Sequence, residues 1–166
     1  MKAIERLPFR QWADINRTEK FISIEPLSGY RRALREDDGH AIYLMPDATN
    51  AALGEAVLQA LDKSRFIWPP DEREFFAADR IMLTEQNWHK DVVRRYAYKT
   101  KRDLYKNMNW VRAKRSEGKI SIRPHQRRDK PGEWLWLSPD QKVVIPETCD
   151  AAALGSALRL AFDRCE

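Results

Sequence analysis

The feature of the sequence that most constrains its fold is an internal repeat. Residues 21–26 (Phe-Ile-Ser-Ile-Glu-Pro) recur as residues 119–124 (Lys-Ile-Ser-Ile-Arg-Pro). In each copy apolar and polar residues alternate, which predicts a strand, and the copy ends in a proline that we expect to stop strand pairing. A repeat of this kind predicts two structural units of the same design.

The similarity continues through a second strand and a helix. Residues 43–46 and 143–146 are short, mainly apolar segments that end in proline, and both predict strands. A helical pattern follows each of them, over about residues 50–65 and 151–165. The repeated unit is therefore predicted to be a strand, a second strand and a helix.

Capping residues and apolar stripes support the two helices. The first is expected to begin after Thr49 or Asn50 and the second after Asp150, because these residue types accept hydrogen bonds from free N–H groups. Gly54 and Gly155 lie inside the helices, where glycine is costly, so we expect another backbone to approach closely there. A stripe on each helix predicts packing on a sheet: Leu53, Val57, Ala60 and Leu61, then Leu154, Leu158, Ala161 and Phe162.

The chain is predicted to form a single domain, residues 1–166. Two related units, at about residues 20–66 and 109–166, would flank a helical insert at about residues 67–108. The chain has 166 residues, of which 43% are hydrophobic, and this length and composition are typical of one domain with one core.

The insert and the segment after it predict further elements. A helix is expected over about residues 84–98, with three residues on one face: Trp88, Val92 and Tyr96. A short helix through Leu104 and Met108 should follow the N-cap residue Thr100. Residues 109–115 and 119–124 predict a hairpin joined at 116–118, and residues 134–137 another strand. The predicted fold class is α+β, with a largely antiparallel sheet of five or six strands and helices packed on it.

The sequence contains no catalytic, cofactor-binding or metal-binding motif. A nucleophile elbow, a phosphate-binding glycine loop and a metal-ligand spacing are all missing from it. Asp71, Glu117 and Lys119 resemble the parts of a nuclease site, but two predicted helices separate them and Glu117 falls in a predicted turn. The histidines are expected at the surface or at the rim of the core: His40, His89 and His125.

Targeting and redox features predict a cytoplasmic protein. Residues 1–8 carry no apolar stretch of the kind found in a secretory signal. The longest apolar run, residues 41–45, is far too short to span a membrane. In the reducing cytosol we expect Cys149 and Cys165 to be thiols.

A basic segment offers one interpretation of the function. Charged and aromatic side chains interleave there, as in proteins that bind RNA or single-stranded DNA. The basic residues are Lys99, Lys101, Arg102, Lys106, Arg112, Lys114, Arg115 and Lys119, and the rings are those of Tyr96, Tyr98, Tyr105 and Trp110. The other interpretation is a solvated face with core-facing tyrosines.

An ordered set of short motifs resembles a known family. Most of residues 21–166 is similar to the immunity proteins of bacterial contact-dependent growth inhibition systems (CdiI). The resemblance is carried by residues 36–39, 46–48, 53–54, 64–66, 98–101, 104–108, 153–155, 157–159 and 162–165. It implies a cytoplasmic protein, and the missing motifs predict that this protein has neither enzymatic activity nor a cofactor. Such a protein would bind the C-terminal toxin domain of a cognate effector, CdiA, as a 1:1 heterodimer and would neutralise it.

The resemblance also implies the chemistry of the partner. Toxins of these systems are commonly nucleases, often acting on tRNA, so the expected partner is a nuclease domain and nucleic acid is not the expected ligand. Contact residues do not carry over, because they differ between members of such systems.

Two acidic clusters are candidate toxin-binding residues. A nuclease cleft is positive because it attracts a polyanion, so carboxylates suit an inhibitor that covers it. The candidates lie in predicted loops: Glu36, Asp37 and Asp38, and after the double proline Asp71, Glu72 and Glu74. Turn carboxylates that only solvate the chain or cap a helix are the alternative.

Overall fold

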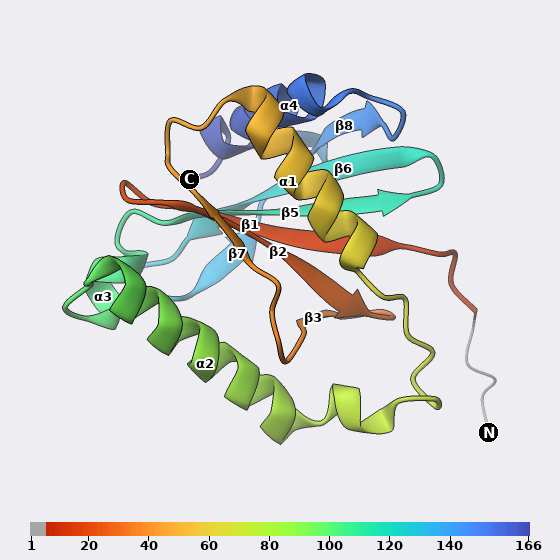
Figure 1. Ribbon diagram of the computed structural model, residues 1–166, viewed down its shortest axis with the longest axis horizontal. Coiled ribbons are helices and arrows are strands. Elements are labelled where there is room, and N and C mark those ends of the chain that lie inside the picture. The colour runs from red at the N-terminus through yellow and green to blue at the C-terminus, as the bar shows by residue number, and fades with distance from the viewer. Residues whose placement is uncertain (1–5) are drawn as a thin grey trace.

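A computed structural model describes residues 6–166, so the prediction made for residues 1–8 lies largely outside the described residues. Eight strands of the described chain form one curled sheet in which all strand pairs are antiparallel (Figure 1). The strands are β1 (Gln11–Arg17), β2 (Ile22–Gly29), β3 (Ala33–Arg35), β4 (Ile42–Leu44), β5 (Asn109–Ser116), β6 (Lys119–Arg127), β7 (Trp134–Trp136) and β8 (Val143–Pro146). The predicted α+β class is confirmed, with more strands than the five or six expected.

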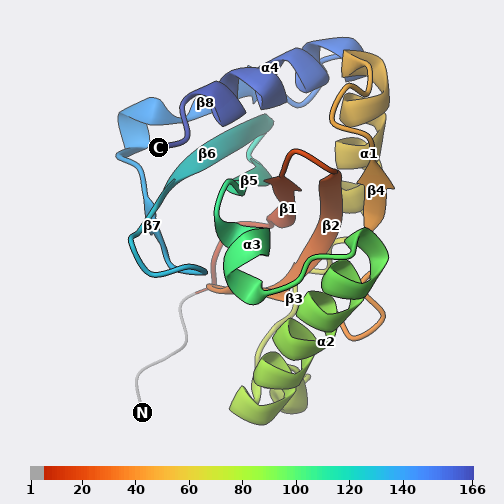
Figure 2. The same cartoon turned by 90° about the vertical axis from the view of Figure 1, so that its left-hand side faces the viewer.

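The described residues also form four α-helices and two 3-10 helices. The α-helices are α1 (Asn50–Lys63), α2 (Ala78–Tyr96), α3 (Lys101–Tyr105) and α4 (Ala151–Asp163), and the 3-10 helices are η1 (Arg73–Phe76) and η2 (Pro139–Gln141). Helices α1 and α4 cover one face of the sheet, and α2 and α3 lie on the side away from α4 (Figure 2). In the described part of the chain, no helix is long and apolar enough to cross a membrane.

The order of elements occurs twice. Strands β1 to β4 are followed by α1, and β5 to β8 are followed by α4. The strand order is β3-β2-β1-β5-β6-β7, with β4 also paired to β2 and β8 to β6. In each half, a long strand pairs on its outer edge with two short strands. The two halves therefore meet at the centre of the sheet, where β1 pairs with β5.

The expectation that Pro26 and Pro124 stop strand pairing is wrong. Both lie inside long strands and pair with a residue of the neighbouring central strand. On the outer edge, β4 pairs up to Ile24 and β3 pairs from Leu27, so Pro26 faces the break between them. The Pro124 carbonyl accepts a hydrogen bond from the Leu137 N–H at 3.2 Å, so Pro124 faces the outer edge as well. The missing proline N–H thus falls where the edge pairing is interrupted.

Most local predictions match the structure. Thr49, Thr100 and Asp150 are the N-caps, each accepting a hydrogen bond from a helix N–H. The β5–β6 hairpin turns at Glu117 and Gly118, whose φ angles of 52° and 79° fit a type I′ turn.

Several element boundaries differ from the predictions, among them the end of β6 at Arg127 instead of Pro124, and β1 and β3 were not expected. Helix α2 begins at Ala78 and not near residue 84. This start was not predicted, because the N-cap residue Ala77 has no side chain that could signal it. Helix α3 ends at Tyr105, and β4 ends at Leu44, before Pro46.

The helices α1 and α4 cross at two glycines. The predicted stripes are buried, and Leu53, Val57, Leu154 and Leu158 are fully inaccessible to solvent. A Cβ atom on Gly54 would overlap the carbonyl of Ala151, and one on Gly155 would overlap the carbonyl of Asn50. The expected close approach of another backbone is confirmed, and it is reciprocal between the two helices.

Replacing either glycine by alanine should destabilise the protein. We expect Gly54→Ala and Gly155→Ala each to lower the free energy of unfolding by about 3 kcal/mol, because the overlap outweighs the helix propensity of about 1 kcal/mol that alanine gains. Urea denaturation measures the change, with the exposed neighbour Glu55→Ala as control, expected to stay within about 0.5 kcal/mol. If both glycine variants were as stable as the wild type, α1 and α4 could move apart without a loss of stability.

Candidate functional site

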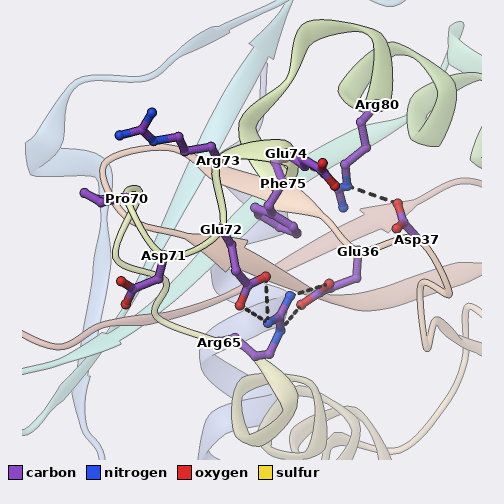
Figure 3. A pocket seen from close by; sticks show the side chains of 10 residues that line it. All are labelled: Glu36, Asp37, Arg65, Pro70, Asp71, Glu72, Arg73, Glu74, Phe75 and Arg80. Atoms are coloured by element: carbon purple, nitrogen blue, oxygen red, sulfur yellow. Dashed lines mark hydrogen bonds and ion pairs between the residues drawn. The ribbon is translucent and has the colours of Figure 1, made fainter.

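The two acidic clusters that the sequence placed apart meet in one pocket. The pocket has a volume of about 600 Å³ and lies where the loops after β3 and α1 meet η1 (Figure 3). Its carboxylates are Glu36, Asp37, Asp71, Glu72 and Glu74, and we term it the acidic pocket. Asp38, the sixth candidate, lies outside it in a neighbouring pocket, where it pairs with His40 at 2.9 Å.

A small apolar cluster holds η1 in place beneath the acidic pocket. Phe75 is buried against Leu34 and Ile67. The guanidinium groups of Arg65 and Arg80 lie over the Phe75 ring, at 5.5 and 3.9 Å from its centroid. One buried ring therefore fixes both the 3-10 helix and the two arginines that pair with the acidic loops.

Arg65 joins the two clusters. Its guanidinium donates to both carboxylate oxygens of Glu36, at 2.7 and 3.1 Å, and of Glu72, at 2.9 and 3.2 Å (Figure 3). Burial disfavours the charged form of Glu36, but hydrogen bonds from Arg65 and Ser28 outweigh it and lower the pKa of this carboxyl group. Arg80 pairs with Asp37 at 3.1 Å.

The remaining carboxylates are available to a partner. Asp71 and Glu74 are exposed and, within residues 6–166, form no ion pair with a basic side chain. Among the described residues, five carboxylates and three guanidinium groups line the pocket, so it is negative on a chain whose formal net charge is +5. The arrangement suits cationic side chains of a partner. Sequence reasoning missed Arg65 and Arg80, since neither stands out from other surface arginines.

The structure does not bring the nuclease-like set of residues together. Asp71 lines the acidic pocket, whereas Glu117 and Lys119 belong to the β5–β6 hairpin and do not line it. Among residues 6–166, no group of three or more His, Cys, Asp or Glu side chains is arranged to hold a metal ion. The nuclease-like set is therefore a coincidence of sequence.

The basic segment does not form one surface. Arg115 pairs with Asp62 of α1, on the helix-covered side, while Arg112 pairs with Asp14 on the opposite side of the sheet. Tyr98 is buried, and its hydroxyl group hydrogen-bonds with that of Thr18 at 2.9 Å. The expected alternative of core-facing tyrosines is confirmed, since Tyr96 and Tyr105 pack against the same apolar cluster.

His125 is buried, which corrects the prediction of a surface or rim position, while His40 is exposed and His89 half-buried. The His125 ring lies 3.6 Å from that of Trp110 and 3.7 Å from that of Trp136. Burial lowers the pKa of His125 to about 4, although its bond to the Trp110 carbonyl acts in the other direction.

Altering Arg65 should change the acidity of Glu36. We expect Arg65→Gln to raise the pKa of Glu36, because the largest favourable contributions to its carboxylate are lost. A pH titration of the carboxyl carbons by NMR measures the shift, with Arg73→Gln as the control in the same pocket. An unchanged pKa in the Arg65 variant would mean that the two loops are not joined in solution.

His125 should make stability depend on pH. The pKa is about 4 in the folded chain and about 6.5 when unfolded, so the unfolded state binds the proton first as the pH falls. The contribution of His125 to the free energy of unfolding is therefore constant above about pH 6.5. It falls as the pH is lowered toward 4, by at most about 1.4 kcal/mol per pH unit. His125→Phe should lose less stability than the wild type between about pH 7 and about pH 5. Parallel profiles would contradict the buried neutral ring.

Comparison with known proteins gives consistent matches. A family model described as CdiI, CDI immunity protein, matches residues 11–165. The immunity protein CdiI-YPIII of Yersinia pseudotuberculosis serotype O:3 (strain YPIII) is 29% identical over 169 residues, which cover 93% of this chain and 95% of that protein.

Two solved structures share the fold over all or nearly all of their length. One is a protein of unknown function from Neisseria meningitidis, which is 28% identical, with all of both chains covered and a TM-score of 0.88. The other is a CdiA-CT/CdiI toxin and immunity complex from Yersinia pseudotuberculosis, at 28% identity, 95% and 98% coverage and a TM-score of 0.89. The resemblance expected from the sequence motifs is confirmed: this chain belongs to the CDI immunity protein family.

Proposed function

We propose that this protein binds the C-terminal toxin domain of a cognate CdiA effector as a 1:1 heterodimer and blocks it in the cytoplasm. Membership of the immunity family and the full-length similarity to a chain of a toxin and immunity complex support this function. It acts by binding and has no catalytic activity of its own.

The acidic pocket supports a nuclease, and within that class a tRNase, as the toxin. A nuclease cleft must hold the phosphates of its substrate, so its walls carry Lys and Arg side chains. The carboxylates of Asp71 and Glu74 project from an exposed turn and from η1, and Glu72 and Glu36 lie beside them. Such a group of carboxylates offers the cleft oxygen atoms in place of phosphate and so competes with the substrate.

The role of Asp38 differs from that of the other candidates. It does not line the acidic pocket, and it pairs with His40 in the neighbouring pocket. A contact with the toxin at Asp38 therefore requires an interface that extends past the turn after β3.

Neutralisation should require stoichiometric amounts. Mixing the purified protein with its cognate toxin domain should give a 1:1 complex with a dissociation constant of about 1 nM or tighter, and RNA cleavage should stop near one equivalent. Gel filtration with light scattering measures the stoichiometry, and an RNA cleavage assay measures the block. Full protection at strongly substoichiometric amounts would contradict binding and indicate an enzyme.

Reversing charges in the acidic pocket should weaken the complex. We expect Asp71→Lys with Glu74→Lys to lower the affinity at least about tenfold, since close interfacial charge pairs are coupled by about 1.5 to 7 kcal/mol. Neither residue takes part in an ion pair within residues 6–166, so the fold should be kept.

The matched control reverses two exposed acids elsewhere. Asp47→Lys with Glu55→Lys gives the same change in net charge, on and beside α1. Calorimetry on both double variants separates a local contact from a general charge effect. Equal affinities for the two variants would remove the acidic pocket from the interface.

A further inference from the structure

A second large pocket lies on the sheet face away from α1 and α4. Its volume is about 640 Å³, and seven Lys or Arg side chains of the described residues line it, among them Arg10, Lys114, Arg123 and Lys142. We term it the basic groove. Lys114 and Arg123 alternate along their strands with core residues such as Ala113 and Ile122, which places them on the opposite face.

Among the described residues, little negative charge faces Lys114, Arg123 and Lys142. The described carboxylate that lines the basic groove, Glu85, pairs with Arg35 at 2.6 Å. Asp14 lies nearby, and its two oxygens accept hydrogen bonds from Arg112 at 2.7 and 3.1 Å. Among residues 6–166, Lys114, Arg123 and Lys142 form no ion pair with a carboxylate.

The crowding of like charges has a cost within the fold. Arg112 and Arg123 lie directly opposite each other on β5 and β6, an arrangement that destabilises a sheet. Burial lowers the pKa of Lys114, and the cations of Lys142, Arg10 and Arg123 lower it further, against the opposing effect of Glu117. An anionic occupant would relieve this repulsion.

The aromatic residues of the basic groove do not suit nucleobases. Trp12 is only 5% exposed and offers no free ring face. The Trp136 ring is 42% exposed, but it already contacts His125 at 3.7 Å and the guanidinium groups of Arg123 and Arg112 at 4.9 and 5.3 Å. Because single-stranded nucleic acids bind by stacking as well as by charge, carboxylates are the better match.

We propose that the basic groove binds an acidic segment of the protein partner. The groove and the acidic pocket are neighbours on either side of the junction of β3 and α2: Ala33 and Ile81 line the groove, and Glu36 and Arg80 line the pocket. One partner can therefore contact both with regions of opposite charge. The inference that the groove binds carboxylates depends only on the residues that line the groove. The identification of the partner as the toxin rests on the proposed function.

The first test uses the free protein and a synthetic probe. A peptide of alternating Glu and Gly residues should bind in a salt-dependent manner, with NMR shifts at the amides of residues 112–114 and 121–123. Lys114→Glu with Lys142→Glu should weaken binding at least about tenfold, whereas Lys90→Glu with Lys99→Glu, at exposed positions, should not. Binding that is equal in both double variants would overturn the proposal.

The second test includes nucleic acid and a milder variant. Oligouridylate of the same charge should bind more weakly than the peptide, and tighter binding at the same amides would overturn the assignment to an acidic protein segment. Lys114→Gln with Lys142→Gln should keep or raise the melting temperature while weakening peptide binding. It therefore replaces the double Glu variant if that variant does not fold.

The third test uses the cognate toxin domain. The Lys114→Glu, Lys142→Glu variant should bind it at least about tenfold more weakly than the wild type. If the variant loses peptide binding but keeps its affinity for the toxin, the toxin does not occupy the groove. The groove would then be a site for another acidic protein. If the wild type does not bind the toxin at all, the proposed function fails, and the peptide result still decides whether the groove binds carboxylates.

Discussion

Arg35 of β3, which forms a buried ion pair with Glu25 of β2, connects the sheet to helix α2 of the insert. Arg35 donates to both oxygens of Glu25 at 2.6 to 3.0 Å, pairs with Glu85 of α2, and stacks on Trp88. Burial opposes its charge, but the two glutamates outweigh burial and raise the pKa of Arg35. Loss of one partner of such a pair typically costs about 3 to 5 kcal/mol. The position of α2 depends on the contacts of Arg35 with Glu85 and Trp88. The separation of the acidic pocket from the basic groove depends on the same contacts.

The predictable parts of the fold are those with local signals. Caps at Thr49 and Asp150, the glycine turn at Gly118 and the helix stripes depend on neighbours in sequence. Strand β1 was not predicted, although the repeat extends to it. Trp12 and Trp110 are 98 positions apart, and so are Pro26 and Pro124. The prolines were misjudged for another reason: whether a strand tolerates proline depends on where its edge partners end, which is a property of the assembled sheet.

The candidate site was predictable in its residue types but not in its geometry. The two acidic clusters are visible as loop carboxylates, yet nothing local indicates that Arg65 holds Glu36 and Glu72 together. The burial of His125 depends on rings contributed by β5 and β7, which single-strand patterns do not reveal. Side chains that meet only after the sheet has formed leave no signal in their own segment of sequence.

The pairing of β1 with β5 has a consequence for self-association. Asp14 of the first half and Arg112 of the second occupy equivalent positions, counted from Pro26 and Pro124, and lie directly opposite each other at the centre of the sheet. If two first halves paired in the same register, Asp14 would face its own copy, and two second halves would bring Arg112 against Arg112. Both alternatives place like charges in contact in a buried sheet. The central charge pair thus makes each half selective for its complement and disfavours strand exchange between identical halves of two chains.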